Sequence, residues 1–230
     1  MTIKKIDAYI VERARSGDHE AFGAIFEEYG PPVAGYLFRL LGDREAARDL
    51  SQETFLKVYR GLPRLHLENN DLEAREFNLS AWIFTIAHHN AIDYLRQKKR
   101  NGRSLASLSF GWLDFGRFRG GGGGVSVEER IEDAELCLTD EAERIALGDT
   151  VGRVLAQLSK EQAACLILHY HQGFSYSEAA EILEIPLTTF KMRLYRARQA
   201  FQAAYRNEMS EQSMEQNNFL KYNGGETNER

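Results

Sequence analysis

The sequence predicts an all-α protein made of two small helical domains joined by a flexible linker. Apolar residues recur at helical spacing in both halves of the chain, and no segment alternates apolar and polar residues as a half-buried strand does. Serine, threonine and aspartate stand where helices would begin. Five consecutive glycines, Gly120 to Gly124, separate the two helical parts; ordering them would cost much conformational entropy, as is typical of a flexible linker.

The N-terminal part, residues 5–101, is expected to fold as one helical domain. Asp18, Asp43 and Ser80 are expected to cap helices, because their side-chain oxygens accept hydrogen bonds from the first free amides. Pro31 and Pro32 are expected to break the chain and begin a new helix, since proline has no amide hydrogen. The expected helices span residues 6–15, 18–29, 31–41, 43–60 and 81–100, with a polar loop over 62–79.

The linker is expected over residues 102–138. Four aromatic side chains stand just before its glycine run: Phe110, Trp112, Phe115 and Phe118. Two interpretations stay open, because these rings either dock on a partner or form a local cluster that covers one of the domains.

The C-terminal part, residues 139–206, is expected to form the second helical domain. After a helix over 139–158, Ser159 and Gln162 form a capping box that opens a helix through about His171, which Gly173 ends. The last segment, residues 207–230, is polar and is expected to be a disordered tail.

Residues 173–201 have the layout of a helix-turn-helix. Ser175 and Glu178 form another capping box at the start of its first helix. The turn is expected at residues 184–186, because Pro186 cannot continue a helix. Thr188 or Thr189 is then expected to cap the second helix.

The second helix of this motif has an apolar back and a basic front. Positions 190, 194, 197 and 201 form the apolar stripe, whereas residues 186–206 include five basic residues and no acidic one. Such a helix suits the major groove of DNA and its flanking phosphates. The alternative is an ordinary amphipathic helix with a solvated basic face.

Composition and charge limit the class of protein. The chain is 43% hydrophobic with a net charge of −5, has no apolar run long enough to span a bilayer, and begins without the apolar core of a signal peptide. Its two cysteines, Cys137 and Cys165, fit free thiols in a reducing compartment, so a cytoplasmic location without membrane insertion is expected.

The charges are unevenly distributed. One basic cluster follows the helix expected at 81–100 and a second lies on the last helix, whereas acidic residues gather over 128–143. This pattern indicates two DNA contacts and at least one protein contact. The first cluster consists of Arg96, Lys98, Lys99, Arg100 and Arg103.

The sequence holds no catalytic constellation, so no enzyme activity, catalytic residue or cofactor is expected. His88 and His89 do not indicate a metal site, because adjacent helical residues do not face one another.

Four stretches, in the correct order, resemble the extracytoplasmic-function (ECF) group of the bacterial sigma-70 family of RNA polymerase sigma factors. Residues 49–59 resemble the polymerase-binding helix of region 2, and residues 81–96 resemble its promoter-melting helix. Residues 151–170 resemble the start of region 4, which the helix-turn-helix completes. The resemblance implies a subunit that directs transcription initiation and whose partners are core RNA polymerase, duplex promoter DNA, the melted non-template strand and an anti-sigma factor.

The resemblance also implies roles for individual residues. Contacts to core polymerase are expected from Asp49, Gln52, Glu53, Leu56 and Tyr59. Contacts to the minus-ten element and the melted strand are expected from Trp82, Thr85, His88, His89, Asp93, Arg96, Lys99 and Arg100. Contacts to the minus-thirty-five element are expected from Ser175, Thr188, Thr189, Lys191, Met192, Tyr195, Arg196 and Arg198.

Some of these positions depart from the family's pattern or allow a plainer interpretation. His88 and His89 stand where the family commonly has Arg-Asn, Glu184 where it has Gly, and Met192 where it has Ser. Trp82 is either a core residue or a base-stacking one. Without the resemblance, the face that holds Asp49 and its neighbours would be read as a solvated helix surface.

Two other classes of protein fit the sequence less well than a sigma factor does. An independent helix-turn-helix regulator would need neither the 49–59 face nor the basic melting-type helix. An enzyme of nucleic-acid metabolism would need a carboxylate cluster, a phosphate-binding loop or a nucleophile, which the sequence lacks. The sequence therefore favours the promoter-specificity subunit.

Overall fold

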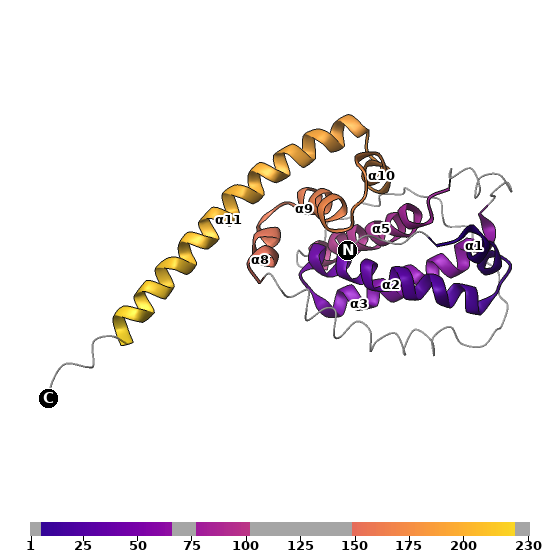
Figure 1. Ribbon diagram of the computed structural model, residues 1–230, viewed down its shortest axis with the longest axis horizontal. Coiled ribbons are helices and arrows are strands. Elements are labelled where there is room, and N and C mark those ends of the chain that lie inside the picture. Colours follow the sequence, from indigo (N-terminus) through magenta and orange to yellow (C-terminus); the bar gives the residue numbers. More distant parts are fainter. Residues whose placement is uncertain (1–5, 66–76, 102–148, 224–230) are drawn as a thin grey trace.

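The computed structural model describes residues 6–65, 77–101 and 149–223, and these residues are helical with short connections, as the all-α prediction requires (Figure 1). Several predictions lie outside the described ranges. They concern the linker at 102–138 with its four aromatic residues, Arg103, Cys137, the acidic segment at 128–143 and residues 139–148. The N-terminal domain consists of α1 (Ala8–Arg15), α2 (His19–Leu41), α3 (Arg44–Gly61), the 3-10 turn η1 (Leu62–Arg64) and α5 (Leu79–Asn101). The C-terminal domain consists of α8 (Asp149–Gln157), α9 (Lys160–Leu166), the π-helical turn η2 (Ile167–His171), α10 (Tyr176–Ile182) and α11 (Leu187–Asn223).

Several helix ends are set by the capping residues that the sequence predicts. The Asp18 carboxylate accepts hydrogen bonds from the amides of Glu20 and Ala21 at 2.9 and 3.1 Å. The Asp43 carboxylate accepts from the Ala46 amide at 3.2 Å. These backbone hydrogen bonds favour the charged form and are the first cause of the lowered pKa of both carboxyls.

The predicted break at Pro31 and Pro32 is wrong, because α2 runs through both prolines. Each proline removes an intrahelical hydrogen bond, at a typical cost of about 3 kcal/mol. Burial on both sides of the prolines outweighs this cost, because Ile25 and Tyr29 before them and Val33 after them are at most 1% exposed. One continuous helix is the arrangement that buries all these side chains.

Two other helix starts differ from the prediction. The cap of α5 is Asn78 and not Ser80, since the Asn78 Oδ1 atom accepts from the Ala81 amide at 3.1 Å and from the Ser80 hydroxyl at 2.7 Å. In α11 the Phe190 amide donates to the Pro186 carbonyl at 2.9 Å, so the helix starts directly after the proline. Thr188 and Thr189 therefore lie in its first turn as exposed residues and do not cap it.

The end of α11 also differs from the prediction. A disordered tail was expected from residue 207, and this prediction is wrong for residues 207–223, which are helical. The helix continues to Asn223 and extends beyond the rest of the molecule in Figure 1. Packing against α8 supports the part of this extension nearest the domain, where Glu208 pairs with Arg153 and accepts from Gln157 at 3.3 Å. The extra turns are polar, which is why composition alone indicates disorder there.

The two domains pack against each other, with α10 on α5 and with α8, α9 and η2 on α2 (Figure 1). Their buried residues join in one apolar core, which includes Phe84 of α5 and Phe174 just before α10. Among the described residues, no helix is both long and apolar enough to cross a bilayer. The same residues contain no cluster of three or more metal-ligating side chains.

Acidification is expected to destabilise this fold from pH 6.5 downward. Burial is the first cause that lowers the pKa of His88 and of His171 from 6.5 to about 4, so both rings are neutral in the folded chain and take up protons more readily once unfolded. Their contribution to stability is therefore complete above pH 6.5 and is lost as the pH falls toward 4.

Urea unfolding between pH 7.5 and 4.5 measures this effect. His171→Gln is expected to remove about half of the fall in unfolding free energy, because it removes one of two titrating groups. His19→Gln changes an exposed histidine and serves as the control. A slope that neither substitution alters would contradict the assignment.

Candidate nucleic-acid interface

The helix-turn-helix is built by local hydrogen bonds. The Ser175 amide donates to the Glu178 carboxylate at 2.8 Å, and the Glu178 amide donates to the Ser175 hydroxyl at 3.3 Å, which completes the capping box of α10. The turn is closed by the Ile185 amide, which donates to the Ala180 carbonyl at 3.0 Å. Glu184 has a φ of +51°, a left-handed conformation that costs a non-glycine residue about 1–2 kcal/mol.

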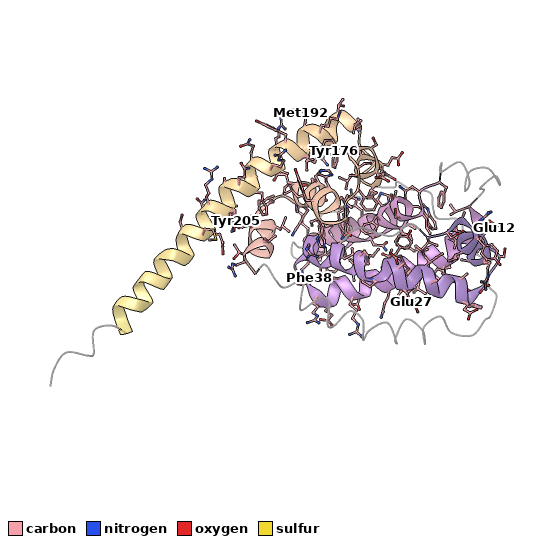
Figure 2. All side chains as sticks on the ribbon, in the orientation of Figure 1. Glu12, Glu27, Phe38, Tyr176, Met192 and Tyr205 are labelled. Atoms are coloured by element: carbon pink, nitrogen blue, oxygen red, sulfur yellow. The ribbon has the colours of Figure 1, made fainter. Side chains whose placement is uncertain are left out.

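The buried stripe of α11 determines which residues it presents to solvent. Phe190, Leu194 and Ala197 are at most 2% exposed, whereas Met192 and Tyr195 are 55% and 59% exposed. Met192 projects from the outer surface of the domain (Figure 2). The full outer face, which we term the α11 face, consists of Lys191, Met192, Tyr195, Arg196 and Arg198.

The α11 face is free to attract an anionic partner. None of its three cations forms an ion pair with another residue in the described part of the chain. Ser175, Thr188 and Thr189 are also exposed at the two helix starts of the same motif. A basic helix with an apolar back and two exposed hydroxyl-bearing starts can contact both phosphates and base edges.

The predicted residues of α5 divide into two groups along the helix. Asp93, Arg96, Lys99 and Arg100 are exposed, and the first two are joined at 3.4 Å. The group nearer the start of α5 is partly covered: Trp82 packs against Phe77 with ring centroids 6.2 Å apart, and the Thr85 hydroxyl donates to the Ala81 carbonyl at 2.9 Å. This geometry favours the core interpretation of Trp82 over the base-stacking one.

His88 and His89 lie between the domains. His88 Nδ1 shares a hydrogen bond of 2.8 Å with the Tyr36 hydroxyl of α2, and burial, followed by His89 and Arg193, lowers its pKa to about 4. His89 Nε2 lies 3.3 Å from a carboxylate oxygen of Glu184. The two histidines therefore face different groups.

The outer face of α3, which we term the α3 face, carries the residues predicted to contact core polymerase. Asp49 and Glu53 are exposed, whereas Gln52, Leu56 and Tyr59 are half-buried. Glu53 pairs with Lys57 at 2.8 Å. The opposite face of α3 is buried and includes Ala47, Leu50, Thr54 and Val58.

Sequence reasoning missed the polar residues that join the domains. The Asn78 side chain donates to the Glu178 carboxylate at 2.7 Å, and the Gln172 side chain donates to the Pro32 carbonyl at 3.1 Å. Gln172 is only 3% exposed. The sequence around Gln172 does not predict this burial. Its partner Pro32 is 140 positions away, and a hydrogen bond over that separation leaves no local pattern.

Comparison with known proteins agrees with both halves of this description. Residues 25–101 match the family Sigma-70 region 2, and residues 149–201 match Sigma-70, region 4. The chain is 26% identical over 197 residues to the ECF RNA polymerase sigma factor SigW of Bacillus subtilis, covering 86% of this chain and 95% of the relative. It is 28% identical over 200 residues to the ECF RNA polymerase sigma-E factor of Escherichia coli, covering 87% and 94%.

Solved structures share the fold. The structure of CnrH in complex with the cytosolic domain of CnrY matches with a TM-score of 0.54 at 20% identity, covering 86% of this chain and 95% of that chain. The sigma factor RpoE of Bartonella quintana, in complex with the anti-sigma factor NepR, matches with a TM-score of 0.53 at 21% identity, covering 81% and 98%.

The matches to Sigma-70 region 2 and region 4 together span more than half of the sequence. The chain therefore belongs to the ECF group of the sigma-70 family and is a non-enzymatic sigma factor for promoter recognition by RNA polymerase.

Proposed function

We propose that this sigma factor contacts core polymerase through the outer face of α3, the minus-ten element through α5, and the minus-thirty-five element through the α11 face. In this proposal residues 5–101 act as region 2, residues 139–206 act as region 4, and residues 102–138 connect them. The protein acts in the cytoplasm. The observation that carries the proposal is the α11 face, whose exposed cations lack acidic partners in the described part of the chain.

Charge and exposure support the division of labour between the three surfaces. The α3 face has exposed carboxylates and half-buried Leu56 and Tyr59, a combination that suits a protein partner with basic residues. The end of α5 and the α11 face carry exposed cations that suit phosphates. Met192 offers no hydrogen-bond donor and favours contact with a thymine methyl group.

An anti-sigma factor is proposed as a further partner. Two proteins of the same fold, CnrH and the RpoE of Bartonella quintana, were solved in complexes with CnrY and NepR respectively. Co-purification of this chain with candidate inhibitors, followed by loss of transcription in their presence, tests this part of the proposal.

Run-off transcription with core polymerase and genomic fragments tests the proposal as a whole. Addition of this protein is expected to produce transcripts from a specific set of start sites. A folded, polymerase-bound chain that yields no promoter-specific transcript would contradict it.

Arg196→Ala is expected to reduce discrimination between matched and mismatched minus-thirty-five sequences by about 1–3 kcal/mol, the usual worth of a bidentate contact to a base edge. Fluorescence anisotropy with holoenzyme and the two duplexes measures the difference. Arg206→Ala removes an exposed cation from the same helix and serves as the control. Equal weakening on both duplexes would show that Arg196 holds a phosphate.

Asp49→Lys is expected to weaken binding to core polymerase by about tenfold or more, ~1.4 kcal/mol, because it reverses an exposed charge on the α3 face. Glu181→Lys makes the same change of charge on the exposed side of α10 and is the matched control. Surface plasmon resonance with immobilised core enzyme compares them. Identical affinities for the two variants would move the polymerase contact away from α3.

A further inference from the structure

The Asp43 carboxylate joins the start of α3 to the end of α5, two helices that pack against each other (Figure 1). Its Oδ1 atom accepts from the Ala46 amide at 3.2 Å and so caps α3. Its Oδ2 atom accepts from the Tyr94 hydroxyl and from the Lys98 ammonium, both at 3.3 Å. The oxygen that contacts α5 is therefore separate from the one that caps α3.

Tyr94 and Lys98 form one row on α5, because residues four apart in a helix are neighbours on its surface. The Lys98 ammonium donates to the Tyr94 hydroxyl at 3.4 Å and lies 5.5 Å from the centre of its ring. The Tyr94 ring is half-buried and packs against the core. The hydrogen bond to Asp43 is the first cause that raises the pKa of Lys98, so its ammonium is favoured in this contact. We term Asp43, Tyr94 and Lys98 the α5 anchor.

The end of α5 has little support from buried side chains. None of the side chains of residues 92–100 is buried, whereas Phe84, Ala87 and Ala91 earlier in the helix are all 0% exposed. A helix end with few buried contacts opens locally more readily than the rest of the helix. The α5 anchor therefore lies where the helix depends most on contacts at the surface.

The α5 anchor is a small network, which distinguishes it from an isolated surface ion pair. An isolated pair contributes little, because two flexible side chains must be ordered to form it. In the anchor, the cap of α3 already holds the Asp43 carboxylate, and the core already holds the Tyr94 ring. The Lys98 ammonium thus meets two groups whose positions are set by other contacts.

The cations of α5 that are proposed to contact DNA lie on another row of the helix. Arg96, Lys99 and Arg100, which we term the α5 cations, are three or four positions from Arg96 or next to each other, and all three are exposed. Arg96 and Arg100 each lie two positions from Lys98, and residues two apart do not share a helix face. In the described part of the chain, neither Lys99 nor Arg100 forms an ion pair. Attachment of the Tyr94 row to α3 therefore turns the α5 cations toward solvent.

We propose that Lys98 is a positioning residue and not a DNA contact, and that the α5 anchor orients the α5 cations toward promoter DNA. This inference rests on the proposed contact between α5 and DNA. The basic cluster at the end of α5 thus contains cations for DNA and one cation that orients them.

Two substitutions separate the anchor from the cap of α3. Asp43→Asn keeps an oxygen for the cap, because asparagine caps helices about as well as aspartate, but it removes the charge that contacts Lys98. Lys98→Gln removes the other charge of the pair. Asp18→Asn is the matched control, because Asp18 also caps a helix of this domain and pairs with a cation, Arg13.

Amide hydrogen exchange of the free full-length chain reports on the anchor itself and involves no DNA. Asp43→Asn and Lys98→Gln are each expected to speed exchange at residues 95–101 by about threefold, because the helix end opens more often. Asp18→Asn and Lys99→Gln are expected to leave this exchange unchanged. Wild-type exchange in both Asp43→Asn and Lys98→Gln would overturn the inference.

Binding of the holoenzyme to a promoter fragment found by run-off transcription provides the second measurement. Loss of a carboxylate by itself strengthens attraction to phosphates, so Asp18→Asn is expected to bind as tightly as the wild type or slightly more tightly. Asp43→Asn is expected to bind about threefold more weakly, because the α5 cations lose their orientation. Tighter binding by Asp43→Asn would contradict a positioning role.

The salt dependence of the same binding separates positioning from phosphate contact. Lys99→Gln is expected to make the slope of log affinity against log salt shallower by about 0.7–0.9, the change for one lost phosphate contact. Lys98→Gln is expected to weaken binding with the slope of the wild type, because the bound state keeps its phosphate contacts. If Lys98→Gln lowers the slope as much as Lys99→Gln does, Lys98 holds a phosphate and the inference is wrong.

Failure of the proposed function has a different signature. An unchanged slope for Lys99→Gln would contradict the proposed contact between α5 and DNA. It would leave the result of the exchange measurement untouched, and that measurement still decides whether Asp43 and Lys98 hold the end of α5.

Discussion

Burial of one long helix organises the whole molecule. Helix α2 packs against α1, α3 and α5 of its own domain and against α8, α9 and η2 of the other. Its residues Ile25, Val33, Leu37 and Leu40 are all 0% exposed, and they lie on both sides of the Pro31-Pro32 pair. The core around α2 can close only if the helix stays continuous, so tertiary packing prevails over the local preference of proline.

The recognition surface follows from a similar constraint in the C-terminal domain. The apolar stripe through Phe190 and Leu194 fixes the rotation of α11 about its axis, which leaves Tyr195 and Arg196 outside. The turn before α11 is closed by the Ile185 amide, which donates to the Ala180 carbonyl, and the Pro186 carbonyl accepts the first hydrogen bond of α11. The orientation of the basic face is therefore a consequence of core packing and local capping, which were both legible in the sequence.

How far the sequence predicts the structure depends on the range of each interaction. Asp18, Asp43 and Ser175 cap helices through amides two or three residues away, so their patterns were sufficient. Asn78 and Ser80 both have side chains that can cap a helix, and the structure uses Asn78. Asn78 also bonds Glu178, a residue 100 positions away in the sequence, and such a contact leaves no local pattern. The contact of His89 with Glu184 likewise joins the two domains and leaves no local pattern in the sequence.

Two of the unusual positions, His89 and Glu184, meet at the contact between the domains. Glu184 adopts a left-handed conformation that glycine would adopt without strain, and its carboxylate reaches His89, which is itself a departure. A glycine at position 184 would be unstrained but would lack this carboxylate, so the contact with His89 requires the strained residue. The two parts of the helix-turn-helix therefore have different surroundings: its second helix presents the cations proposed to read DNA, while its first helix packs on α5.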